Sequence, residues 1–89
     1  MQTGIQDIYS LIYRSKVVIC DFSNKNPNVF YEAGIAHSLG REVIPIVQHP
    51  DDIPFDLNHH RYIQYLNNDE GLEKLVANIT PRLKTLMSR

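Results

Sequence analysis

The sequence predicts an α/β fold in three layers, in which helices cover a partial parallel sheet of about three strands. Over the 89 residues, helical and strand patterns follow one another in the order helix, strand, helix, strand, strand, helix. Strands that alternate with helices are typical of right-handed crossovers between parallel strands. The run Val17–Cys20 is apolar at every position, which is typical of a strand covered on both faces of such a sheet. We therefore expect one small domain that binds its ligands at the carboxyl ends of the strands.

The first helix is predicted over Thr3–Ser15, with Thr3 as its cap. Its apolar residues fall on one side of the helix: Ile5, Ile8, Leu11 and Ile12. This amphipathic pattern is typical of a helix that covers an apolar surface. Lys16 then leads directly into the first strand.

The second helix carries clear start and stop signals. Asn26 is a favourable cap, and Pro27 is well suited to the first helical position. The helical pattern runs from Val29 to Leu39, and Gly40 supplies the stop. Free backbone N–H groups at the start of this helix would favour an anionic ligand group.

The second strand is predicted over Glu42–Gln48, although Pro45 lies within it. Proline removes a donor from the ladder, which argues for an edge position or an irregularity. A long polar loop, His49–Arg61, leaves the carboxyl end of this strand, where loops are often part of a site. Three apolar residues are expected to hold the loop in place: Ile53, Phe55 and Leu57. A short strand is predicted next, over Tyr62–Leu66.

The last helix follows a capping stretch, Asn67–Glu70. One apolar face continues to the end of the chain through Leu72, Leu75, Val76, Ile79, Leu83 and Leu86. Pro81 lies within this pattern, and we expect it either to kink the helix or to split it.

Composition argues against several classes of function. The formal net charge is −1, so it predicts neither nucleic acid nor an anionic membrane as a partner. No apolar stretch approaches transmembrane length. The single cysteine, Cys20, rules out an internal disulfide and fits a reducing cytoplasm, where we expect the protein. Because Cys20 lies within an apolar strand, we expect a buried structural thiol rather than a nucleophile.

Two acids are predicted at the edge where the strands end. Asp21 comes directly after the first strand, and Glu32 falls in about the first turn of the second helix. A purely structural alternative is that Glu32 complements the helix dipole while Asn26 and Asn28 cap the helix.

The histidines do not predict a metal site. The chain contains four of them: His37, His49, His59 and His60. The adjacent His59 and His60 cannot easily present both rings to one ion, and no zinc-type spacing occurs.

The run NPNVFYEAGIAHSLGREVIPIV, followed by IPFDL and RYIQY, resembles a known group of domains. It is similar to the nucleoside 2-deoxyribosyltransferase-like superfamily, which is related to Toll/interleukin-receptor-like domains that bind or cleave nicotinamide dinucleotide. The shared pattern is an Asp that ends a strand, an Asn-Pro-Asn loop, and Tyr-Glu-x-Gly-x-Ala at the start of a helix. Here these are Asp21, residues 26–28 and residues 31–36. The resemblance implies a flavodoxin-like sheet.

The resemblance also implies a site and a reaction. Glu32 matches the catalytic glutamate, whose carboxylate would attack or stabilise the anomeric carbon as an N-glycosidic bond is cleaved or transferred. Asp21 would orient a sugar hydroxyl or hold Glu32 through water. The residues expected to bind substrate are Ser23, Asn26, Asn28 and Tyr31. The expected ligand is a nucleoside, a nucleotide or nicotinamide dinucleotide, with no cofactor.

The chain departs from the family pattern in two ways. The family begins with a further strand and helix, so residues 1–89 are expected to be a single, N-terminally truncated domain with an unpaired strand edge, which favours a homo-oligomer. Transferases of this family also tend to carry an acid six residues before the glutamate, where this chain has Asn26. The alternative function is therefore a non-catalytic module of the Toll/interleukin-receptor-like kind, which senses a nucleotide or self-associates.

Overall fold

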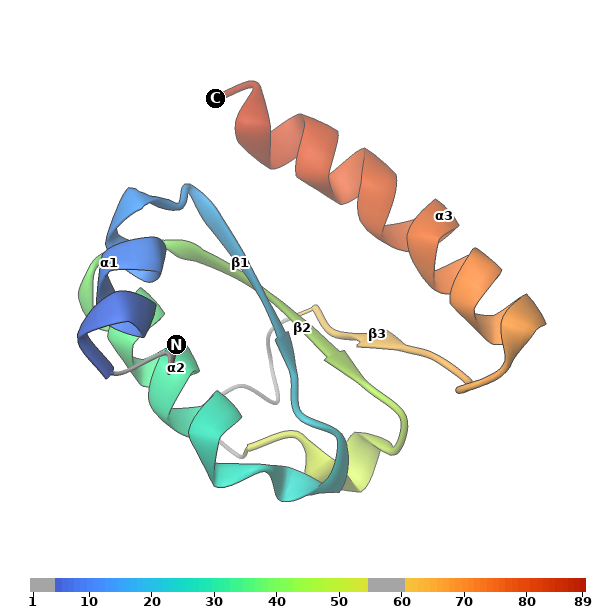
Figure 1. Cartoon of the computed structure of the whole chain (residues 1–89). Coiled ribbons are helices and arrows are strands. Elements are labelled where there is room, and N and C mark those ends of the chain that lie inside the picture. Colours follow the sequence, from blue (N-terminus) through green and yellow to red (C-terminus); the bar gives the residue numbers. More distant parts are fainter. Residues whose placement is uncertain (1–4, 55–60) are drawn as a thin grey trace.

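A computed structural model describes residues 5–54 and 61–89 (Figure 1). Its helices and strands are α1 (Ile5–Arg14), β1 (Val17–Asp21), α2 (Pro27–Ser38), β2 (Glu42–Val47), β3 (Ile63–Gln64) and α3 (Asp69–Met87). Two short 3-10 turns, η1 (Ser23–Lys25) and η2 (Pro50–Asp52), follow β1 and β2. The predicted order of helices and strands is confirmed. The proposed cap Thr3 lies outside the described residues.

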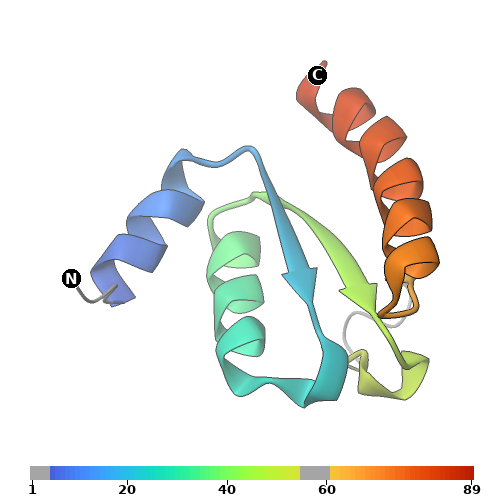
Figure 2. The same ribbon diagram turned by 45° about the vertical axis from the view of Figure 1, so that its right-hand side comes forward.

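The three strands form one parallel sheet in the order β1-β2-β3, which confirms the predicted fold class. Helices α1 and α2 lie on one side of the sheet and α3 lies on the other (Figures 1 and 2). All three strands run in the same direction, so their carboxyl ends meet at one edge, beside the start of α2. This edge is the predicted place for a site.

Pro45 lies in the central strand, so the edge position that its missing N–H suggested is wrong. β3 pairs with β2 only from Ile46 onward. The preceding hydrogen bond of a parallel ladder would run from the backbone N–H of residue 45 to the Arg61 carbonyl, but proline has no N–H. That carbonyl instead accepts a hydrogen bond from Arg82 Nη1 at 2.9 Å. Proline thus ends the ladder, and β3 is shorter than the predicted strand Tyr62–Leu66.

Local signals set the start and end of α2 as predicted. The Asn26 side chain accepts a hydrogen bond from the Asn28 backbone N–H at 3.0 Å, and Pro27 is the first helical residue. Beyond the last turn, Gly40 has a φ of 70°, in the left-handed region that glycine adopts without strain.

The core lies between α2 and the sheet. One cluster of buried residues there consists of Cys20, Phe22, Ala33, Val47 and Ile53. Burial of Ile53 confirms that this residue holds the segment after β2 in place. The other two residues expected to do so, Phe55 and Leu57, lie outside the described residues.

The opposite face of the sheet is covered less completely. Ile19 in β1 is 44% exposed, so the prediction of a strand covered on both faces is wrong at this position. On α3, Leu72 and Val76 are exposed, whereas the remaining residues of the predicted apolar face are half-buried: Leu75, Ile79, Leu83 and Leu86. The helix continues through Pro81, so the predicted split does not occur.

Near the start of α3, the backbone at Gly71 lies so close to the preceding segment that only glycine fits. A Cβ atom added at Gly71 would lie 2.1 Å from the Leu66 carbonyl oxygen. We expect Gly71→Ala to lower the free energy of unfolding by about 1–3 kcal/mol, because either the helix start or the β3–α3 connection must shift. At Gly34 an added Cβ meets nothing within 4 Å, so Gly34→Ala is expected to stabilise α2 by about 0.5–1 kcal/mol. Urea unfolding of both variants measures the contrast, and equal effects would contradict it.

Candidate functional site

Four polar side chains join the carboxyl ends of all three strands, and we call them the rim cluster: Asp21, Ser23, Gln48 and Tyr65. Asp21 Oδ1 accepts a hydrogen bond from the Ser23 backbone N–H at 3.0 Å, and Asp21 Oδ2 accepts one from the Tyr65 hydroxyl. Ser23 Oγ accepts a hydrogen bond from the Gln48 backbone N–H at 3.0 Å, and Gln48 Nε2 donates to the Tyr65 hydroxyl at 3.5 Å. The cluster therefore holds the Asp21 carboxylate in a fixed orientation.

The electrostatics of the rim cluster favour an ionised acid beside a neutral phenol. Partial burial would raise the pKa of Asp21, but hydrogen bonds from Ser23 and Tyr65 outweigh it and lower this pKa below its ordinary range. Burial, together with the hydrogen bond to Asp21, raises the pKa of Tyr65. At neutral pH the cluster thus presents a carboxylate, which acts as an acceptor for ligand hydroxyl groups.

The turns after β1 and β2 are fastened to each other at the same edge. The Asn24 backbone N–H donates to Asp52 Oδ2 at 2.9 Å, which joins η1 to η2. Asn24 and Lys25 have φ values of 63° and 53°, a conformation that asparagine tolerates better than most residues. The turn between Asp21 and α2 is thereby held in a defined shape.

Glu32 is placed differently from the expectation. It is the sixth residue of α2, and the first turn of this helix contains no acid, so its interaction with the helix dipole is weaker than predicted. Its side chain is half-buried and makes no hydrogen bond or ion pair within the described part of the chain. Glu32 lies close enough to Cys20 for its charge to help raise the pKa of that thiol. No hydrogen bond joins Glu32 to Asp21.

The other predicted site residues lie around the start of α2. Ser23 belongs to the rim cluster, and Asn26 caps the helix through its side chain. Tyr31 is 58% exposed, which leaves its ring available to a ligand and excludes a place in the core.

The expected free backbone donors at the start of α2 are already used. The N–H of Asn28 donates to the Asn26 side chain, and the next two N–H groups donate to the Asn26 carbonyl at 3.1 and 3.4 Å. An anionic ligand group at this helix start would therefore rely on side-chain amides. The expectation of a backbone anion site is wrong here.

Two members of the rim cluster, Tyr65 and Gln48, were not predicted from the sequence. The relevant signal is a polar residue at the carboxyl end of each parallel strand, but recognising it requires the register between strands. Beside Tyr65, a groove of about 320 Å³ opens between β3 and α3. It is lined by Gln64, Tyr65, Leu66, Asn68, Glu70, Gly71, Lys74 and Asn78. The rim cluster thus borders a space at the lower end of the size of ligand pockets.

Residues 5–54 and 61–89 contain no group of three His, Cys, Asp or Glu side chains that could hold a metal ion. His59 and His60 lie outside these ranges. Among the helices of the described chain, none combines the length and the apolar character needed to cross a membrane.

The hydrogen bond between Tyr65 and Asp21 predicts a pH-dependent effect on stability. Tyr65→Phe should lower the free energy of unfolding at pH 7 by about 1 kcal/mol. This loss is smaller than that for a buried hydrogen bond to a charged group, because solvent screens the two partly exposed side chains. The folded-state pKa of Asp21 is lowered, so this stabilisation is present above the ordinary carboxyl pKa and is lost as pH falls through the folded value. Denaturant unfolding at several pH values measures the difference between Tyr65→Phe and wild type.

Tyr62→Phe is the matched control, because Tyr62 is also partly exposed beside β3 and takes no part in the rim cluster. A loss that is the same for both variants, or that persists unchanged at acid pH, would contradict the role given to the Asp21–Tyr65 pair.

Comparisons with known proteins give no match, so a functional proposal depends on the local geometry and the motif pattern. No family model matches the chain, and neither does any curated protein or solved structure. Chemically, this edge offers a fixed carboxylate at Asp21. On α2, Glu32 has a carboxylate without a hydrogen-bond partner among the described residues, and Tyr31 exposes its aromatic ring.

Proposed function

We propose that this chain is a nucleoside- or nucleotide-binding domain of the deoxyribosyltransferase-like type, with its ligand over the carboxyl ends of β1, β2 and β3. The observation that carries the proposal is the rim cluster, which fixes an ionised Asp21 at the edge where parallel sheets bind ligands. The resemblance of the Asp21 to Ala36 segment to that family supports the same choice of ligand.

Each part of a nucleoside has a counterpart at this edge. A carboxylate such as Asp21 accepts hydrogen bonds from ribose or deoxyribose hydroxyl groups. The exposed ring of Tyr31 offers a surface on which a base stacks. The side-chain amide of Asn28 at the start of α2 supplies donors for the sugar or a phosphate.

The proposed reaction is cleavage or transfer of an N-glycosidic bond with Glu32 as the nucleophilic carboxylate. One Glu32 oxygen forms a bond to the anomeric carbon, while the base leaves with the electron pair of the broken bond and takes up a proton from water. Water or a second base then displaces Glu32 from that carbon. Because Glu32 has no hydrogen-bond partner in the described chain, its lone pairs are available for this attack.

Ligand titration tests the binding proposal. Deoxynucleosides, nucleoside monophosphates and nicotinamide dinucleotide are each titrated into the chain and followed by NMR chemical shifts. Asp21→Asn should weaken the binding of the preferred ligand about tenfold, because it removes a charged acceptor. Asp51→Asn is the control, since Asp51 is an exposed acid nearby in η2. Absence of binding by all three ligand classes would refute the proposal.

A second candidate function, a self-associating sensing module, is favoured by one specific observation. β1 is a terminal strand of the described sheet, and its Ile19 is 44% exposed, which together provide a template for another strand. We expect a dimer in sedimentation measurements at micromolar concentration. Ile19→Lys should shift the chain toward monomer, because a charge on an edge strand opposes pairing. A wild-type chain that sediments as a monomer would contradict self-association.

A further inference from the structure

Basic residues gather at the amino ends of the strands, at the opposite edge of the sheet from the rim cluster. Lys16 and Arg41 directly precede β1 and β2, and Arg61 precedes β3 by two residues. Helix α3 runs back to this edge and adds Arg82 and Arg89 near its end (Figure 1). The net charge of the whole chain is −1, so this local excess of positive charge does not reflect the composition.

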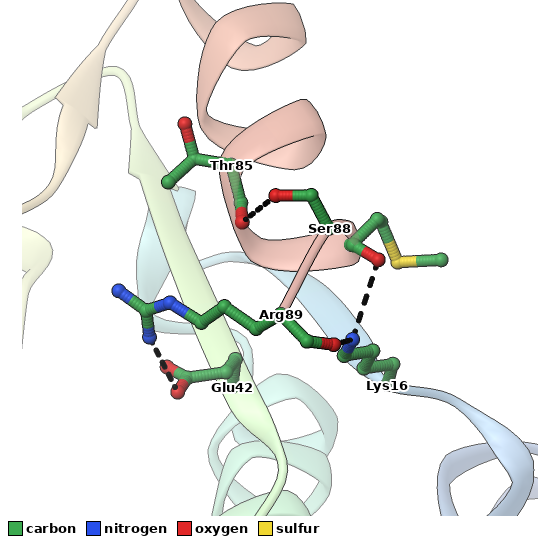
Figure 3. Close-up of polar contacts among 6 residues, drawn as sticks. Lys16, Glu42, Thr85, Ser88 and Arg89 are labelled. Carbon is green, nitrogen blue, oxygen red and sulfur yellow. Dashed lines mark hydrogen bonds and ion pairs between the residues drawn. The ribbon is translucent and has the colours of Figure 1, made fainter.

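Three of these five cations, Lys16, Arg41 and Arg89, contact protein groups at this edge. Lys16 Nζ donates to the backbone carbonyl oxygens of Met87, at 3.3 Å, and of Arg89 (Figure 3). The Arg89 guanidinium pairs with Glu42 at 3.5 Å. Arg41 Nη2 donates to a backbone carbonyl of α1 at 2.8 Å, and its guanidinium lies over an aromatic ring of that helix.

Neither Arg61 nor Arg82 has a carboxylate partner among the described residues, and both line the same open space. Arg82 Nη1 donates to the Arg61 backbone carbonyl at 2.9 Å, which fixes the position of Arg82 and leaves its other nitrogens available. Partial burial and then the nearby charge of Arg61 lower the pKa of Arg82. Two like charges are thus held near each other, and the described residues place no carboxylate between them.

Both arginines line the same open space between β3 and α3, which we call the basic groove. It has a volume of about 460 Å³ and is lined by Arg61, Tyr62, Ile63, Gln64, Asn78, Pro81 and Arg82. The described lining contains no acid. A neighbouring groove of about 320 Å³ shares Arg61, Pro81 and Arg82.

We propose that the basic groove binds a phosphate group, either as free phosphate or as a small phosphomonoester. Guanidinium groups present planar pairs of donors that match phosphate oxygens, and two of them converge here. A bound dianion relieves the repulsion between Arg61 and Arg82. The Asn78 amide provides a neutral donor in the same groove, and the volume admits a substituent on the phosphate. This site is independent of the proposed function at the rim cluster.

The test is a titration with inorganic phosphate and with phenyl phosphate at constant ionic strength, followed by NMR signals of arginine side chains and of Asn78. We expect saturable binding with a dissociation constant of about 1 mM or lower. Arg61→Gln and Arg82→Gln should each weaken it about tenfold. Arg61→Gln keeps the backbone carbonyl that Arg82 uses, so this variant tests the site without removing that hydrogen bond.

Lys84→Gln is the matched control, because it removes one exposed positive charge from α3 outside the groove. Its phosphate affinity should stay within about twofold of wild type. Arg82→Lys keeps the charge but loses the planar pair of donors, so it should bind less tightly than wild type. Tighter binding of phenyl phosphate supports a phosphomonoester, and equal binding of both probes supports free phosphate. Non-saturable shifts, or equal losses in Lys84→Gln and Arg61→Gln, would overturn the proposal.

Discussion

Replacing Glu32 with glutamine is expected to abolish nearly all base release while the fold is retained. The amide keeps the size and most of the hydrogen-bonding capacity of the carboxylate but cannot act as the nucleophile. Loss of the covalent route should lower turnover by several powers of ten, about 10³-fold or more. Release of base is measured by chromatography with deoxynucleosides, nucleoside monophosphates and nicotinamide dinucleotide as substrates.

The three substrates separate the proposed reactions. Base release from a deoxynucleoside favours the transferase-like function, and nicotinamide release from the dinucleotide favours the receptor-like one. Binding without any release favours the sensing module. Glu73→Gln is the control, because Glu73 is an exposed acid on α3 and lies away from the rim cluster. Turnover that survives Glu32→Gln undiminished would refute the catalytic role of Glu32.

The same substitution also tests the purely structural role of Glu32. Stabilisation of a helix dipole by an acid amounts to about 0.3–1 kcal/mol and falls off beyond the first turn. Glu32 is the sixth residue of α2, so Glu32→Gln should cost less than this range if the dipole is its only partner. A small change in stability combined with a large loss of turnover is the result that the proposed reaction requires.

The second large effect is expected at Cys20, whose thiol should be nearly inert in the folded chain. Burial, assisted by the charge of Glu32, raises the pKa of Cys20 from 9.0 to about 11. This higher pKa lowers the thiolate fraction near pH 8 by about a hundredfold. The side chain is also only 3% exposed, which restricts access by a reagent. Alkylation by iodoacetamide should therefore be at least about 100 times slower in the folded chain than in denaturant.

A second thiol, introduced into the helix α2 beside the sheet, provides the control for reagent and pH. Ser38 is exposed at the end of α2, so the thiol introduced by Ser38→Cys should react at an ordinary rate in the folded protein. Mass spectrometry after timed quenching assigns the label to each site. Rapid labelling of Cys20 in the folded chain would contradict its burial and would reopen the possibility of a nucleophilic thiol.

The candidate site could be predicted only in part. Asp21 and Glu32 were assigned to the carboxyl-end edge, because strand direction and chain order decide which residues reach it. Tyr65, which donates to Asp21, lies 44 positions further along the chain. A hydrogen bond over this separation depends on strand register, and no local pattern encodes it. The sequence also suggested free donors at the start of α2, whereas Asn26 already satisfies them.

The sequence by itself determined the features that depend on neighbouring residues. The start of α2 at Pro27 and its end before Gly40 follow from capping and from backbone conformations that only nearby residues influence. The strand–helix–strand order of β1, α2 and β2 likewise determined the parallel pairing of β1 with β2, because the crossover through α2 returns the chain in the same direction.

Tertiary structure decided the features that depend on what lies opposite each residue. The central strand tolerates Pro45 because β3 does not pair with β2 at this residue, so no backbone N–H is needed there. The Arg61 carbonyl, which that N–H would have reached, accepts a hydrogen bond from Arg82 instead. Ile19 is exposed, although it belongs to an apolar run, because the described elements leave part of that face of the sheet uncovered. Contacts between distant segments decide which side chains are buried, which strands pair, and that Arg61 and Arg82 line one groove. The free energies of these contacts exceed the conformational preferences of the local sequence.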